Sequence, residues 1–295
     1  KNDSEKFGLL KMDFLGLATL GLIKDTLALL GKSYYDMEKL SLDDSEVLKA
    51  FAKGDTHGIF QFESDGMQKL LTRINPTSFA DIAAATALYR PGPLMSGLTD
   101  DYVHNKHSVN PQYTLPEFKE LMAETYGIFV YQEQVMLVSQ RIAGFTLSRA
   151  DNLRKAIGKK DKNLMKTMEE EFINGAVKNG YHQETIQALW DQIVKFADYC
   201  FNKSHSYAYA LLSYWTMYLK IKHPKEFAVS LLSLDIKDTS KLRSHFFAFK
   251  DRIAFLPPYI DRADENFKLI DEGVMMGFGS IKGMGTASTS LVAHQ

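Results

Sequence analysis

The sequence predicts a mainly α-helical protein with a small β-hairpin near its carboxyl end. Apolar residues recur every three or four positions over most of the chain, as expected for helices that bury one face. Glycine or proline follows several of these periodic segments, where a helix would end. The pattern changes only after residue 252, where short runs with strand character begin.

The first predicted helix covers residues 16–31, whose apolar side chains share one face before a glycine ends it. A short second helix is predicted over residues 45–51 and ends by Gly54. A third begins at Ser78, where Ser-Phe-Ala-Asp resembles a capping box, and it must end before Pro91.

The middle of the chain continues in the same way. Further helices are predicted over residues 116–125, 131–143, 147–157, 161–179, 183–199 and 204–222. Pro224 follows the last of them, whose apolar residues again lie on one face. Beyond it, residues 255–258 predict a break, and the runs 267–270 and 274–278 flank a Glu-Gly turn that predicts a hairpin.

The composition is that of a soluble globular protein, with 45% hydrophobic and 24% charged residues among 295. Its length allows two domains. The formal net charge is −1, so a nucleic-acid surface would have to come from local clusters of basic residues. The single cysteine, Cys200, excludes an internal disulfide or a cysteine zinc cluster and fits a reducing cytosol. No apolar run approaches the ~18–20 residues of a membrane span.

The run from Asn202 to His205 is the strongest chemical signal in the sequence. Together with Ser206 it places an amide, an ammonium group, two hydroxyls and an imidazole at the start of a predicted helix. Helix N-terminal amides favour negative charge, and these side chains add donors, so Asn202, Lys203, Ser204 and His205 are candidates for binding a polyanion such as a triphosphate. The alternative is that Ser204 only caps the helix.

Basic residues are concentrated between Arg149 and Lys166, which hold seven basic residues against two acidic ones. Arginine suits bidentate phosphate recognition, and lysine neutralises phosphate as a point charge. The candidates for contact with a nucleotide or a DNA backbone are Arg149, Arg154, Lys155, Lys159 and Lys160. The alternative is an ordinary solvated helix face.

Two glycine- or proline-rich segments supply further candidates. Tyr-Arg-Pro-Gly-Pro predicts a stiff turn that presents Arg90 from a rigid loop, unless it is only a helix stop with a solvated arginine. In Ile-Lys-Gly-Met-Gly, the turn at Gly283 and Gly285 would let backbone amides reach a DNA phosphate without reading sequence. Most Gly-x-Gly segments are ordinary turns.

Six ordered motifs resemble those of one protein family. They occupy residues 11–17, 58–64, 89–93, 131–136, 150–160 and 201–210. Together they resemble the fingers region of the C family of bacterial replicative DNA polymerases, the family of the DNA polymerase III alpha subunit. The resemblance implies that residues 1–32 end the palm, that 33–252 form a multi-helix fingers domain, and that 253–295 begin a truncated tandem helix-hairpin-helix domain. The chain would then be an excised piece of a longer cytoplasmic, nucleoid-associated replisome protein.

The resemblance also implies roles for single residues. Asp13 matches one of three carboxylates that hold two magnesium ions for nucleotidyl transfer, and Lys11 would neutralise phosphate charge on the same strand face. Arg90 would face the active-site cleft. The other two catalytic aspartates belong to a strand upstream, and the sequence has no Asp-x-Asp pair. We therefore expect that the chain alone binds no magnesium stably and does not polymerise DNA.

The expected partners are template–primer DNA and deoxynucleoside triphosphates, with no membrane. A sliding clamp and other replisome subunits would bind through regions outside this chain. The alternative is a non-catalytic, all-helical nucleic-acid-binding module in which Asp13 is only a helix cap; a replication scaffold is a third interpretation. Nucleotide dependence separates the first two, because a passive module would prefer polynucleotide and show only a salt dependence.

Overall fold

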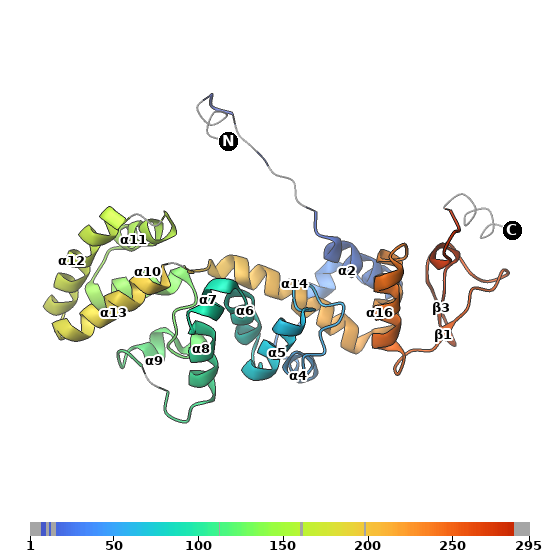
Figure 1. The fold of residues 1–295 in the computed structure, drawn as a ribbon, viewed down its shortest axis with the longest axis horizontal. Coiled ribbons are helices and arrows are strands. Elements are labelled where there is room, and N and C mark those ends of the chain that lie inside the picture. The colour runs from blue at the N-terminus through green and yellow to red at the C-terminus, as the bar shows by residue number, and fades with distance from the viewer. Residues whose placement is uncertain are drawn as a thin grey trace. The chain divides into compact units, whose positions relative to one another are not determined.

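The fold is taken from a computed structural model, which describes residues 7–9, 12, 16–111, 113–159, 162–197 and 199–285. In these residues fifteen α-helices, two short 3-10 helices and one three-stranded sheet confirm the predicted mainly helical fold (Figure 1). None of the helices described is both long and apolar enough to cross a bilayer. The chain divides into two compact units, one of them Leu40–Ile221 and the other formed by the segments on either side of it. The predicted boundaries after residues 32 and 252 stay predictions.

In its described residues, the unit formed by the two flanking segments contains four α-helices besides the last residue of α14. They are α2 (Ala18–Leu29), α3 (Tyr34–Glu38), α15 (Pro224–Leu234) and α16 (Thr239–Phe249). Helix α2 packs against α15, which in turn packs against α16. Ile23, Leu27 and Phe227 are fully or almost fully buried there, so the apolar face predicted within residues 16–31 is confirmed as a core face.

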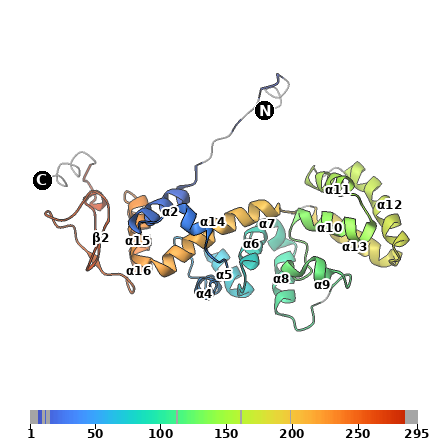
Figure 2. The same cartoon turned by 180° about the vertical axis from the view of Figure 1, so that it is seen from behind.

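The same unit ends in a small sheet with the strand order β1-β3-β2. Strands β2 (Lys268–Ile270) and β3 (Gly273–Met275) pair antiparallel and confirm the predicted hairpin (Figure 2 shows β2). The break predicted at residues 255–258 is wrong for its first two residues. These form β1 (Phe255–Leu256), parallel to β3, because β3 supplies hydrogen bonds that the local sequence does not reveal. The 3-10 helix η2 (Phe278–Ser280) follows the sheet.

In its described residues, the unit Leu40–Ile221 is built from helices joined by turns and loops. It contains α4 (Ser45–Ala52), α5 (Asp65–Ile74), α6 (Phe79–Leu88), α7 (Pro91–Met95), α8 (Leu98–His107), α9 (Phe118–Leu121), η1 (Ala123–Thr125), α10 (Gln132–Ala143), α11 (Leu147–Lys159), α12 (Lys162–Lys178), α13 (Gln183–Phe196) and most of α14 (Lys203–Lys222). The helix predicted over 116–125 is broken at Met122 into α9 and η1, and the one predicted over 183–199 ends at Phe196.

Helices α10 to α13 pack around one apolar core, which lies at one end of this unit (Figure 1). Its largest buried side chains include Phe172 and Trp190, whose ring centroids are 5.3 Å apart. Gly175 in α12 allows a close approach of α12 to α10, because a Cβ atom built there would lie 2.2 Å from the backbone oxygen of Ala143 in α10. The core thereby fixes α11, which carries most of the predicted basic residues.

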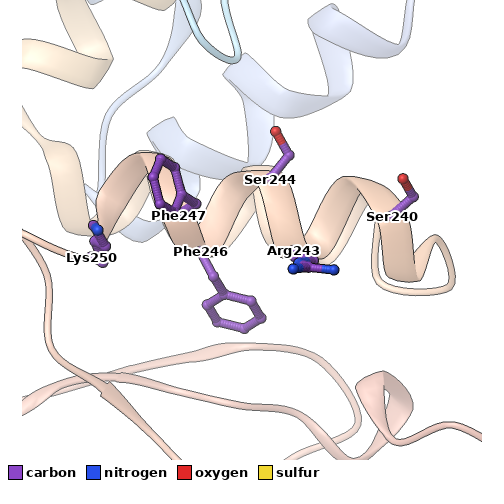
Figure 3. A pocket seen from close by; sticks show the side chains of 6 residues that line it. All are labelled: Ser240, Arg243, Ser244, Phe246, Phe247 and Lys250. Atoms are coloured by element: carbon purple, nitrogen blue, oxygen red, sulfur yellow. The ribbon is translucent and has the colours of Figure 1, made fainter.

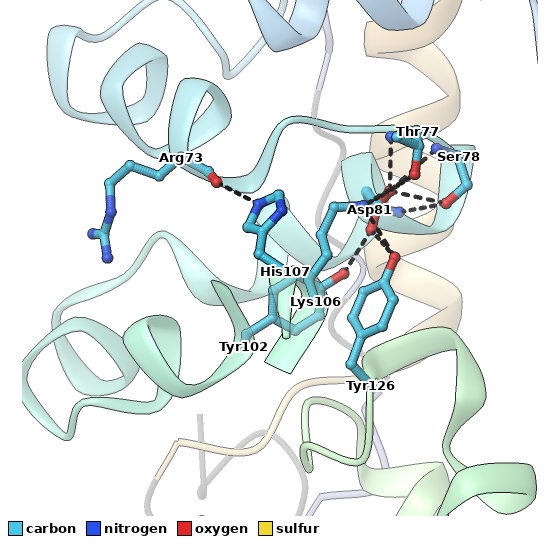
Figure 4. A network of polar contacts seen from close by, with 8 residues as sticks. All are labelled: Arg73, Thr77, Ser78, Asp81, Tyr102, Lys106, His107 and Tyr126. Carbon is cyan, nitrogen blue, oxygen red and sulfur yellow. Dashed lines mark hydrogen bonds and ion pairs between the residues drawn. The ribbon is translucent and has the colours of Figure 1, made fainter. Parts of the chain in front are cut away.

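A buried carboxylate fixes α6 against α8 and the turn after η1 (Figure 4). Asp81 has no exposed surface and accepts hydrogen bonds from the Lys106 ammonium group at 2.7 Å and the Tyr126 hydroxyl at 2.9 Å. The Tyr102 hydroxyl donates to it at 3.0 Å. Asp81 also closes the predicted capping box with Ser78. One side chain therefore both begins a helix and joins three segments.

Candidate functional site

Several of the sequence motifs meet at the start of α14. Tyr131 forms a parallel bridge with Phe201, and the Gln132 amide donates to the Phe201 carbonyl oxygen at 2.9 Å. The Gln132 side-chain amide also donates to the Cys200 sulfur at 3.3 Å. The first turns of α10 and α14 are thus held side by side, although they are about seventy residues apart in the sequence.

Asn202 caps α14. Its side-chain oxygen accepts a hydrogen bond from the His205 amide at 2.9 Å, and its carbonyl oxygen accepts from the Ser206 amide at 3.2 Å. This is the geometry by which Asn satisfies one of the amides that a helix leaves without a partner. The capping role considered for Ser204 is therefore wrong, because Ser204 lies exposed inside the first turn.

An acidic side chain already lies at this helix N-terminus. The carboxylate of Glu133 accepts hydrogen bonds from the Lys203 backbone amide, at 3.0 and 3.2 Å to its two oxygens. It also accepts from the Asn202 side-chain amide at 2.9 Å. A negative charge is favoured at this place by the helix dipole and by the free amide donors. Glu133 thus occupies the position that a bound anion would take.

The Lys203 side chain has an acidic partner of its own. Its ammonium nitrogen lies 2.6 Å from a carboxylate oxygen of Glu124, and the Tyr207 hydroxyl donates to the other oxygen at 2.9 Å. Burial, together with the charge of Glu124, raises the pKa of Tyr207, so this hydroxyl stays a donor at neutral pH. The Lys203 side chain is 35% exposed and can therefore be reached by a ligand from solvent.

Arg90 connects α6 and α7 to the segment before α14. Its Nε atom donates to the Ala87 carbonyl oxygen at 3.0 Å and its Nη2 atom to the Tyr199 carbonyl oxygen at 3.1 Å. The guanidinium carbon lies 4.0 Å from the centroid of the Phe201 ring. Burial lowers the pKa of Arg90 from its ordinary value. The predicted rigid loop is instead the short helix α7, because Pro91 is pre-organised for its first position.

Aromatic rings extend from Arg90 along α14. The rings of Phe201 and His205 meet edge to face, with centroids 5.3 Å apart. His205 stacks on Tyr209 at 4.3 Å, and Tyr209 stacks on Phe60 at 5.6 Å. These contacts fix the orientation of the exposed His205 ring.

The basic residues of α11 are partly neutralised by one acidic residue. Asp151 forms ion pairs with Lys155 at 2.7 Å and with Arg154 at 2.8 Å. The hydrogen bond from Lys155, and after it the one from Arg154, lowers the pKa of Asp151. A Cβ atom at Gly158 would lie 4.0 Å from the Gln132 side-chain nitrogen, so the end of α11 faces the start of α10. Arg154, one turn before Gly158, lies on the same side of the helix.

The remaining candidates lie elsewhere or outside the described residues. Arg149 pairs with Glu171 of α12 and so joins two helices. Gly283, with a φ of +94°, lies in a turn, and the part of the expected helix-hairpin-helix domain after Gly285 lies outside the described residues. Outside them also lie Lys11, Asp13 and Lys160, together with the side chain of Lys159.

Comparison with known proteins identifies the family. Residues 19–180 match the family described as the bacterial DNA polymerase III alpha subunit finger domain. The chain belongs to this family. It is 46% identical over 299 residues to the DNA polymerase III subunit alpha of Aquifex aeolicus, covering 98% of this chain and 25% of that protein. The proteins of the same name from Campylobacter jejuni and Mycobacterium tuberculosis are 42% and 40% identical over 294 and 291 residues. They cover 97% and 95% of this chain, which spans about a quarter of these relatives.

Within this finger-domain family member, the structure adds acidic residues that the sequence analysis did not select. Glu133 lies in the motif Tyr-Gln-Glu-Gln, and its place at a predicted helix start was the signal that could have revealed it. Glu124 gave no such signal, because its contact with Lys203 joins residues 79 positions apart. Each candidate donor of Lys203, the backbone amide and the ammonium group, therefore has an internal carboxylate as its partner.

Proposed function

We propose that this chain is the fingers part of a replicative DNA polymerase and that the start of α14 binds the triphosphate of the incoming deoxynucleotide. The relatives named as polymerase subunits support the first part of the proposal. The meeting of Arg90, Glu133 and Lys203 at one helix start is the observation that supports the second. We further propose that the basic residues of α11 contact the nucleotide or the template–primer backbone.

The donors at this site suit phosphate oxygens as well as carboxylate oxygens. The Lys203 backbone amide and ammonium group point to Glu133 and Glu124, which carry the same kind of oxygen acceptor as a phosphate. A triphosphate would exchange places with at least one of these carboxylates. Because the exchange replaces one charge-assisted interaction by another, the binding is expected to be weak in the chain alone.

The metal chemistry is not assigned to any described residue. Among the residues that the structure describes, no three His, Cys, Asp or Glu side chains gather as a metal-binding group. Asp13, the predicted ligand, lies outside them. We propose that two magnesium ions act only in the complete polymerase, with carboxylates from its other regions, and that this chain alone does not catalyse. The clamp and replisome contacts of the complete polymerase, and its cytoplasmic location, are part of the same proposal.

Replacing Lys203 by alanine should weaken triphosphate binding about tenfold or more, as expected for loss of a charge-assisted hydrogen bond and of charge neutralisation. Isothermal titration of the purified chain with dATP and magnesium measures the change, and inorganic triphosphate shows whether the base contributes. Lys69→Ala is the matched control, because Lys69 is an exposed lysine on α5 of the same unit. Equal affinities of the Lys203 and Lys69 variants would contradict the proposed site. Salt-dependent DNA binding without any triphosphate binding would favour the passive module.

Replacing Glu124 by glutamine should have the opposite effect and strengthen triphosphate binding about threefold to tenfold. The amide oxygen can still accept from the Tyr207 hydroxyl, but the charge that neutralises Lys203 and repels phosphate is gone. Glu120→Gln removes the same charge from an exposed position on the neighbouring α9 and should change little. Weaker binding by the Glu124 variant would show that this carboxylate supports the site rather than competing for it.

A further inference from the structure

A second surface with the chemistry of a ligand site lies on α16, in the other unit. A hollow of about 520 Å³ is lined by six side chains of this helix, namely Ser240, Arg243, Ser244, Phe246, Phe247 and Lys250 (Figure 3). At 100° per residue, Arg243, Phe247 and Lys250 lie within one narrow sector of the helix. Phe246 points toward the small sheet of the same unit, where its ring centroid lies 4.8 Å from that of Phe255 in β1.

Among the described residues, no carboxylate pairs with either cation of this surface, Arg243 or Lys250. Lys241 of the same helix differs, because it pairs with Asp235 at 2.8 Å. The positive charge around Phe247 is therefore available to an anion from solvent, and exposed arginine donors suit phosphate oxygens in particular.

An exposed aromatic ring stands between these cations. Phe247 is 71% exposed, and the Lys250 ammonium nitrogen lies 4.2 Å from its ring centroid. A ring held in the open beside phosphate-binding groups is the arrangement by which proteins bind single strands, since a base stacks on the ring while cations follow the backbone. Ser240 and Ser244 add hydroxyl donors at the edge.

We propose that this α16 surface binds single-stranded DNA, with one base stacked on Phe247 and neighbouring phosphates on Arg243 and Lys250. An acidic protein segment would satisfy the charges equally well but gives no reason for an exposed aromatic ring next to them. A purely apolar partner gives no reason for the cations. Only a polyanion with flat, stackable groups fits both features. The proposal does not depend on the triphosphate site, which is built from other residues.

The test measures binding of fluorescein-labelled oligo(dT) of about 16 nucleotides, the upper end of the site sizes known for single-strand-binding domains. Phe247→Leu should lower the affinity of the chain about fivefold or more, because leucine keeps apolar surface but removes the stacking face. Phe247→Trp should retain the affinity. Arg243→Gln and Lys250→Gln should each reduce the slope of log K against log salt by about 0.7.

Two controls are built into the chain. Tyr35→Leu removes a ring that is 65% exposed and has the Lys39 ammonium nitrogen 4.1 Å from its centroid. This ring lies on α3 and is not part of the α16 surface. Lys241→Gln removes an ion-paired cation of α16 itself. Neither variant should change oligo(dT) binding, and circular dichroism confirms that every variant is folded.

An abasic oligonucleotide of equal charge separates stacking from electrostatics. The wild-type chain should bind it more weakly than oligo(dT), and Phe247→Leu should cause no further loss. Equal effects of Phe247→Leu and Tyr35→Leu would overturn the proposal. The proposal would also be overturned if Phe247→Leu kept its full affinity for oligo(dT) while Arg243→Gln and Lys250→Gln lost theirs. That result would indicate a charged surface on which no base stacks. Preference for polyglutamate over oligo(dT) would assign the surface to an acidic protein partner instead.

Discussion

Asp81→Ala should lower the free energy of unfolding of the chain by about 3–5 kcal/mol, the cost of breaking a buried ion pair on one side. The Lys106 side chain is only 5% exposed, and its ammonium group now lies 2.7 Å from the Asp81 carboxylate. In the variant this buried charge would have lost that carboxylate. The hydroxyls of Tyr102 and Tyr126 would lose the same acceptor. Urea denaturation followed by circular dichroism measures the change.

The control for this prediction is Asp36→Ala. Asp36 closes a capping box with Ser33 just as Asp81 does with Ser78, but it lies exposed at the start of α3. Asp36→Ala should lower the free energy of unfolding much less than Asp81→Ala does, because water can replace the missing carboxylate at an exposed position. The double variant of Asp81→Ala with Lys106→Met should recover part of the stability, since no buried charge then lacks a partner. Equal losses for the Asp81 and Asp36 variants would show that burial contributes nothing.

The same network also predicts the sign of a pH effect. Burial alone would raise the pKa of Asp81, but the hydrogen bonds from Lys106 and Thr77 and the charge of Lys106 outweigh it and lower the pKa below its ordinary value. The stabilisation is therefore complete above the pKa of an unfolded Asp, about 3.9, and is lost as the pH falls through the lower folded value. The Asp81→Ala variant should lack this acid-dependent component.

Gly175→Ala should destabilise the bundle of α10 to α13 by about 3 kcal/mol, at the upper end of what one added methyl group does in a packed core. The new Cβ atom would lie 2.2 Å from the Ala143 carbonyl oxygen, and backbone atoms on both sides cannot move aside as a side chain would. Helices α10 and α12 would have to separate. Thermal and urea unfolding of the purified variant measure the loss.

Gly158→Ala is the matched substitution within the same bundle. Gly158 also lies in a helix, but its nearest neighbour would be the Gln132 side-chain nitrogen at 4.0 Å, an ordinary contact. Alanine there should leave stability unchanged or raise it by up to about 1 kcal/mol, since glycine is the poorer helix former. If both alanine variants have the same free energy of unfolding as the wild type, α10 and α12 do not approach one another as closely at Gly175 as described.

Local features of the fold were predictable from the sequence, and distant ones were not. The helix that begins after Ser78 follows from a capping box whose two members are three residues apart. The same Asp81 meets Lys106 and Tyr126, which are 25 and 45 positions away and which no periodicity connects to it. Strand β1 was missed for the same reason, because its hydrogen-bond partner lies on β3.

The candidate site divides in the same way. The donors of Asn202 and Lys203 stand next to one another in the sequence and were selected from it, whereas their carboxylate partners come from other segments. The pairing of Arg154 and Lys155 with Asp151 is local, three and four residues along one helix, and could have been read from the spacing. The roles proposed for these residues in binding nucleotide and DNA stay predictions.

The position of Cys200 gives this chain a natural reporter. It is the one cysteine among 295 residues, and it lies between Tyr199, whose carbonyl oxygen accepts from Arg90, and Phe201, on which the Arg90 guanidinium stacks. The residue is partly exposed, and its sulfur accepts a hydrogen bond from the Gln132 side chain. A thiol reagent therefore labels the unmodified chain at a single known place beside the start of α14, and its rate follows the local opening of that segment without any engineered probe.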